Sequence, residues 1–99
     1  MTINKTKDGE TLVLALEGRL DTTTASQLQD ALIPEFDANK NIRLDFKGME
    51  YVSSAGLRVV LQAEKTAKAK GGSMTLKNVS EEIMEVFEMT GFSDLLTFE

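Results

Sequence analysis

Ser53 and Ser54 are the residues of this 99-residue chain whose type and position best suit chemistry. They follow the strand-like stretch Met49–Val52 and precede an apolar helical stretch that begins with Ala55 and Gly56. A serine at this position most often serves only as a helix cap, because its oxygen accepts a hydrogen bond from a first-turn N–H group. We expect Ser54 to be this cap. Helix N-termini also favour anions, so a phosphate on Ser54 would be well tolerated.

Other reactive groups are scarce. The chain has no histidine and no cysteine, which removes the commonest general base, the commonest metal ligand and all thiol chemistry. No pair of carboxylates is flanked by apolar residues that would shift its titration. We therefore expect no catalytic residue, no metal, no cofactor and no enzymatic activity.

The charge and hydropathy indicate the kind of partner and the compartment. A net charge of −5 argues against a nucleic-acid surface and favours a protein partner. No apolar run approaches the roughly 20 residues that span a bilayer, and Met1–Lys5 does not resemble a signal peptide. We expect a cytoplasmic protein without direct membrane insertion, folded as one domain over residues 1–99.

The first half of the chain predicts a hairpin, a helix and a strand. Asp8-Gly9 suits a tight turn after an edge strand at Ile3–Lys7. The next strand, Thr11–Glu17, is apolar on both faces, which is typical of an interior strand that is covered at least in part on both sides. The following helix is expected to begin with a capping box, described below, and to end near Pro34. Ile42–Phe46 alternates with the period of a strand.

The helix start after the hairpin has a specific expected geometry. Thr24 and Gln27 have the spacing of a capping box, in which each side chain bonds to the backbone of the other residue. Several other hydroxyl and carboxyl groups precede Thr24, so Asp21 is itself a possible cap. Asp21 is equally suited to a contact with a protein partner or a nucleotide.

The second half predicts two more helices, each followed by a strand. The first helix runs from about Ala55 to Lys70 and ends at Gly71-Gly72, and the second begins with Ser80 as its cap and ends at Gly91. Strands are expected at residues 73–77 and 95–98. The resulting β-β-α-β-α-β-α-β order predicts an α/β fold, with a mixed, mostly parallel sheet of about five strands, an N-terminal hairpin and three main helices.

This topology brings two loops together. Functional loops of open α/β sheets lie beyond the carboxyl ends of the parallel strands, so the 19–22 and 51–54 loops should be neighbours, with Asp21 near Ser54. Arg58 is more often part of a solvated helix face than a recognition residue. Met89, Phe92 and Leu95 could form an exposed apolar rim for a partner, although this is the less common role of such residues. The candidate partner-binding residues are Asp21, Thr22, Ser53, Ser54, Gly56, Leu57 and Arg58.

Four stretches in register carry a resemblance to a known family. Met49–Leu61, preceded by Leu44–Phe46, resembles the phosphorylation segment of the anti-sigma-factor antagonists, whose domain is called STAS. Gly18–Asp21 with Thr24-Ala25, the Gly71-Gly72 turn and Phe87–Phe92 agree in order and spacing. The resemblance spans nearly the whole chain.

The resemblance implies a switchable binding module. In this family the unmodified domain binds an anti-sigma factor that is also a serine kinase, and so releases a sigma factor. Phosphorylation of the serine that begins the helix, here Ser54, dissociates the complex, and a metal-dependent serine phosphatase restores the binding form. Ser53 stands where some members carry aspartate. The sequence does not decide whether Ser53 can replace Ser54 as the acceptor.

Two other functions stay open. The first is a STAS subunit of a lipid or anion transport complex, in which the serine need not be modified. The second is a nucleotide-binding or weakly hydrolytic protein, although the chain has no glycine-rich loop of the P-loop pattern.

Overall fold

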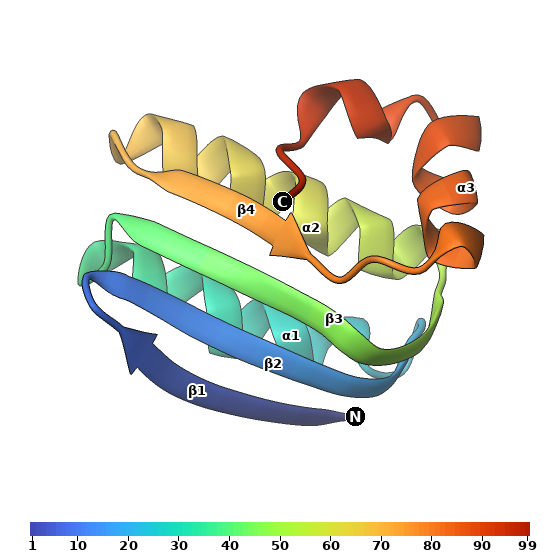
Figure 1. The fold of residues 1–99 in the computed structure, drawn as a ribbon, viewed down its shortest axis with the longest axis horizontal. Coiled ribbons are helices and arrows are strands. Elements are labelled where there is room, and N and C mark those ends of the chain that lie inside the picture. The colour runs from blue at the N-terminus through green and yellow to red at the C-terminus, as the bar shows by residue number, and fades with distance from the viewer.

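The computed structural model describes all 99 residues as an α/β domain built on a four-stranded sheet (Figure 1). The strands lie in the order β1-β2-β3-β4; β1 is antiparallel to β2, and the other pairs are parallel. No helix has the length and apolar character needed to cross a membrane. The elements in chain order are β1 (Thr2–Asp8), β2 (Thr11–Leu20), α1 (Ala25–Leu32), η1 (Ile33–Asp37), β3 (Asn41–Val52), α2 (Ser54–Ala69), β4 (Ser73–Lys77), α3 (Glu81–Met89) and η2 (Phe92–Leu95).

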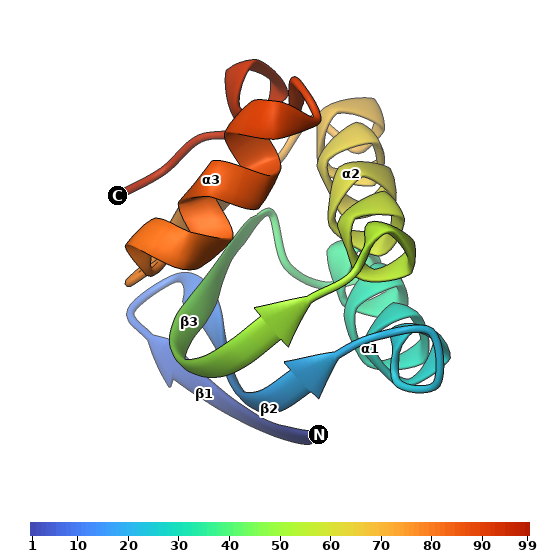
Figure 2. The same cartoon turned by 90° about the vertical axis from the view of Figure 1, so that its right-hand side faces the viewer.

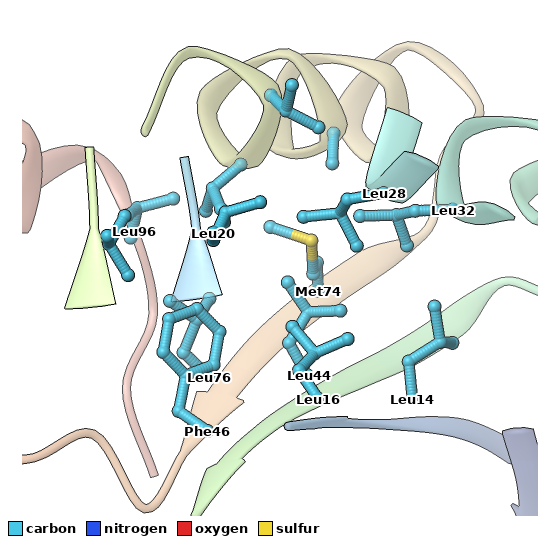
Figure 3. Close-up of a cluster of buried hydrophobic side chains, with 14 of the residues drawn as sticks. Leu14, Leu16, Leu20, Leu28, Leu32, Leu44, Phe46, Met74, Leu76 and Leu96 are labelled. Carbon is cyan, nitrogen blue, oxygen red and sulfur yellow. The ribbon is translucent and has the colours of Figure 1, made fainter. Parts of the chain in front are cut away.

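The core lies between the sheet and helices α1 and α2, which run side by side behind the strands in Figure 1. Alternate residues of the three parallel strands point into this layer, and α2 contributes its small and branched residues Val60, Ala63 and Ala67, as the sequence pattern predicts. Figure 3 shows Leu16 of β2 next to Leu44 of β3, below Leu28 and Leu32 of α1. The fully buried residues of this layer include Leu14, Leu16, Leu20, Leu28, Leu32, Leu44, Phe46, Met74 and Leu76.

The second face of β2 is covered only in part, which agrees with the expectation from its apolar sequence. β2 does occupy an interior place in the sheet, but Val13 and Ala15 are only half-buried. Their register partners on β3 are Arg43 and Asp45, so no continuous apolar layer forms on this face.

The predicted fifth strand at residues 95–98 is wrong. Residues 92–95 form η2 after Gly91, which has the positive φ of 78° expected at the end of α3. Phe98 then makes one isolated parallel bridge to Leu76. The ring of Phe98 contacts Phe87 edge-on, with centroids 5.6 Å apart, so aromatic packing and a few backbone hydrogen bonds hold the tail in place of a full strand ladder.

Several local predictions are confirmed and one is wrong. α1 ends at Leu32, two residues before Pro34, and the Ser80 hydroxyl caps α3 by accepting a hydrogen bond from the Ile83 N–H group. The capping box at the start of α1 does not form. The Thr24 hydroxyl instead donates to the Arg19 carbonyl, and the Gln27 side-chain amide donates to the carbonyl of Met1.

Candidate functional site

The two predicted loops are neighbours, as the topology requires. β2 and β3 end side by side, with Leu20 opposite Val52, and lead into the loops that begin α1 and α2 (Figure 2). The Ser53 N–H group donates a 2.8 Å hydrogen bond to the Leu20 carbonyl, which extends the pairing of the strands into the loops. The candidate site is therefore built on the last residues of two paired strands.

The helix cap of α2 is Ser53, not Ser54 as the sequence predicts. Ser53 has the extended backbone of an N-cap residue, with φ −90° and ψ 173°, and its hydroxyl accepts a 3.3 Å hydrogen bond from the Gly56 N–H group. The strand pairing that fixes the Ser53 N–H group also fixes this backbone, so the helix starts one residue earlier than predicted. Ser54 is the first helical residue and is exposed.

The start of α2 lies unusually close to the end of β2. A methyl group added to Gly56 would sit 2.5 Å from the Cγ atom of Leu20, well inside van der Waals contact. Glycine is needed here because only hydrogen faces the buried Leu20 side chain. This contact sets the position of Ser53 and Ser54 against the neighbouring loop.

The neighbouring loop is organised by the carboxylate of Asp21. One of its oxygens accepts hydrogen bonds from the Thr23 hydroxyl at 2.7 Å, the Thr23 N–H group at 3.0 Å and the Thr24 N–H group at 3.2 Å. These bonds, the one from the Thr23 hydroxyl above all, lower the pKa of Asp21. Asp21 is thus an anion that fixes the turn before α1, while its second oxygen lies 3.9 Å from the Arg19 Nε atom.

The other candidate residues fall into two groups. Thr22 and Arg58 are exposed. Arg58 stands four residues after Ser54, so these two residues share one face of α2. Gly56 and Leu57 lie beneath this surface. Leu57 is 1% exposed and packs in the core, so neither residue presents a side chain to a partner in this conformation.

The candidate site residues chosen from the sequence left out the first side chain of each predicted loop. Arg19 and Tyr51 are register partners on β2 and β3, and the Arg19 guanidinium lies 4.4 Å from the centroid of the Tyr51 ring. The only signal in the sequence was that each residue begins one of the two predicted loops. Register shifts between Ala15 and Glu17 and between Gly18 and Arg19 hide the pairing from a simple count along the strands.

The site is a surface and not a cavity. The two hollows of the domain, about 460 and 390 Å³ in volume, are lined by residues of β1, β2 and β3 such as Glu17, Lys47 and Gly48, and by none from the loops that carry Asp21 and Ser54. An exposed hydroxyl on such a surface can be reached by a macromolecule more readily than a small ligand could be enclosed there.

A family model described as "Mlab, STAS domain" matches residues 3–97. The chain belongs to the STAS domain family. The anti-sigma-B factor antagonist of Bacillus subtilis is 32% identical to this STAS domain over 81 residues, which cover 82% of the chain and 74% of that protein. The relative carries the name of a regulatory protein.

Solved structures agree with the fold of this STAS domain. An anti-sigma-factor antagonist (STAS) domain protein from Planctomyces limnophilus is 18% identical, with a TM-score of 0.85 over 97% of this chain and 87% of that one. SpoIIAA in its unphosphorylated form is 22% identical, with a TM-score of 0.78 over 99% and 87%. The phosphorylated form of Bacillus SpoIIAA is 23% identical, with a TM-score of 0.76 over 99% and 91%. At these identities the likeness concerns the fold.

Proposed function

We propose that this STAS domain is a cytoplasmic, non-enzymatic anti-sigma-factor antagonist that is switched by phosphorylation of Ser54. Its unmodified form binds an anti-sigma factor with serine kinase activity, and a serine phosphatase restores that form. The name of the Bacillus subtilis relative supports the class of partner. The observation that carries the proposal is the division of roles between the two serines: Ser53 caps the helix, and Ser54 is exposed beside it.

The geometry favours Ser54 over Ser53 as the acceptor. The Ser53 hydroxyl is half-buried and already accepts a hydrogen bond, so its modification would remove the cap of α2. Ser54 can be modified without loss of the cap. The first-turn N–H groups of Ser54 and Ala55 have no intrahelical acceptor, and such groups stabilise a nearby anion.

A phosphate at Ser54 would change binding by local charge. It adds about 1.5 to 2 negative charges at the start of α2, next to the loop that carries the ionised Asp21. A complete swing from mostly bound to mostly free requires about 5.5 kcal/mol of differential affinity. Burial of one unpaired charge in an interface costs several kcal/mol, so a single phosphate is sufficient.

The test is mass spectrometry of the purified protein after incubation with ATP and source-cell extract. The wild type should gain one phosphate that maps to Ser54, and Ser54→Ala should gain none. Ser53→Asn is the matched control, because asparagine retains an acceptor for the cap and removes the hydroxyl; it should be phosphorylated like the wild type. Phosphate on Ser53 in the wild type would contradict the assignment.

The same experiment distinguishes the proposed antagonist from the alternative function as a subunit of a transport complex. A STAS subunit of a transport complex need not be modified on either serine. An extract that phosphorylates another substrate but leaves this chain unmodified would therefore favour the transport-associated role.

A further inference from the structure

Arg19 and Tyr51 form an exposed ledge at the ends of β2 and β3. The two residues are opposite each other in the strand register, and the guanidinium of Arg19 stacks 4.4 Å from the centroid of the Tyr51 ring. Their chain neighbours Leu20 and Val52 point into the core. Because successive strand residues point to opposite faces, the ledge lies on the face of the sheet away from α1 and α2.

The ledge is accessible although it contains a large aromatic ring. Tyr51 is 41% exposed, and the Arg19 side chain is 58% exposed. Tyrosine and arginine are the residue types that most often dominate the binding energy of protein interfaces. The stacking holds the ring and the guanidinium in place before any partner arrives, which lowers the entropy lost on binding.

The ledge is continuous with the loops that carry Asp21 and Ser54. Arg19 lies two residues before Asp21, and Tyr51 lies three residues before Ser54. The nearest Arg19–Asp21 approach is 3.9 Å between Nε and Oδ2, which is too long for a hydrogen bond, so the guanidinium keeps donors for a partner. Three residues of chain span at most about 10 Å, so an interface of ordinary size that covers Ser54 can also include this ledge.

We infer that Arg19 and Tyr51 anchor the kinase that modifies Ser54. This inference rests on the proposed function and adds the part of the interface that selects the partner. The complementary surface is an apolar slot for the Tyr51 ring, with a carboxylate at its rim for the Arg19 guanidinium. Neither side chain touches the reacting hydroxyl, so the pair acts in docking and not in phosphoryl transfer.

The test is the kinetics of Ser54 phosphorylation, with the kinase purified from source-cell extract by its activity on the wild-type protein. Tyr51→Ala should raise the apparent KM about tenfold or more and leave kcat within about twofold, because the anchor acts before the chemical step. Arg19→Gln should raise the apparent KM severalfold. Tyr51→Phe, which retains the ring and the stacking, should stay within about threefold of the wild type.

Two control variants remove similar groups elsewhere. Leu95→Ala removes another exposed apolar side chain, on η2, which both views place away from the ends of β2 and β3 (Figures 1 and 2). Lys68→Gln removes an exposed charge about 20 Å along α2 from Ser54. Both should retain the wild-type KM, and thermal melts should show that every variant is folded.

The experiment distinguishes failure of the docking inference from failure of the proposed function. If Tyr51→Ala and Arg19→Gln have the same KM as the controls while the wild type is phosphorylated on Ser54, the docking inference is refuted and the proposed function stands. A loss in kcat alone would also refute it, because that would place the pair in the chemical step. If no kinase modifies Ser54 of the wild type, both proposals fail together.

Discussion

Glu64 is a buried carboxylate whose replacement should stabilise the domain. It lies on α2, is 7% exposed, and has one side-chain oxygen that is buried without a hydrogen-bond partner. Burial raises its pKa, and the ammonium group of Lys68, one turn further along the helix, offsets this only in part. Glu64→Met replaces the carboxylate with an unbranched apolar side chain that has a similar helix propensity.

The expected gain follows from the missing partner. A buried polar group without a hydrogen bond costs about 1–3 kcal/mol. The second oxygen of Glu64 is not among the buried unpaired atoms, so we expect the lower half of this range, about 1–2 kcal/mol at pH 7. For a domain of this size, each kcal/mol raises Tm by about 4–8 °C.

The gain should depend on pH in a defined direction. The folded state binds the Glu64 proton more tightly than the unfolded state, because the folded pKa is raised above its ordinary value of 4.5. The stability that this proton contributes is fully present below pH 4.5 and is lost as the pH rises through the folded pKa. The advantage of Glu64→Met should therefore be smallest in acid and reach its full size near neutral pH.

Urea unfolding of the wild type and Glu64→Met at several pH values between 4 and 7 measures this difference directly. Glu85→Met is the matched control, since Glu85 is an exposed residue of α3, and its effect should stay within about 0.5 kcal/mol at every pH. A Glu64→Met advantage that is constant with pH, or that grows toward acid, would refute the assignment of the cost to the buried charge.

Three further predictions concern helix ends and one close backbone contact. Ser54→Asp should leave Tm unchanged or raise the free energy of unfolding by up to about 1 kcal/mol, because a negative charge in the first turn favours the helix. Loss of a cooperative melt in circular dichroism would contradict the expectation that a charge at this position leaves the domain folded. Gly72→Ala should lower the free energy of unfolding by about 3 kcal/mol or more, since its Cβ would overlap the Lys40 carbonyl. Gly71 lies in open space with φ 74°, so Gly71→Ala should lower it by only about 1 kcal/mol in the same urea assay. Ser80→Ala should cost about 1 kcal/mol through loss of the α3 cap, and Ser80→Asp should restore most of it.

The order of the elements could be predicted from periodicity, but their ends depend on contacts between distant residues. The choice between Ser53 and Ser54 as the cap is one example. It is set by the hydrogen bond from Ser53 to Leu20, more than thirty positions earlier, and no local pattern contains that contact. The start of α1 is another, because the Thr24 hydroxyl turns back to Arg19 and Gln27 reaches Met1.

The conformation of residues 95–98 and the pairing of Arg19 with Tyr51 could not be predicted from the sequence for a similar reason. Residues 95–98 are apolar enough for a strand, yet the Phe98 ring packs on Phe87 and only Leu76 is paired along the backbone. Tyr51 and Arg19 are opposite each other only because two register shifts, each with one extra residue in β3, accumulate along the β2–β3 pair. In contrast, the proximity of the loops after β2 and β3 follows from the topology alone, and this prediction is confirmed.

The separation of the cap from the exposed hydroxyl affects how such a domain can change over generations. Residue 53 must keep a side chain that can cap the helix, since its loss weakens the fold itself. Residue 54 makes no such contribution to the fold, so under the proposed function its replacement would remove the response to phosphorylation with almost no loss of folding free energy. A lineage could then lose the proposed switch in a single substitution and keep a folded domain, which could be recruited to another partner.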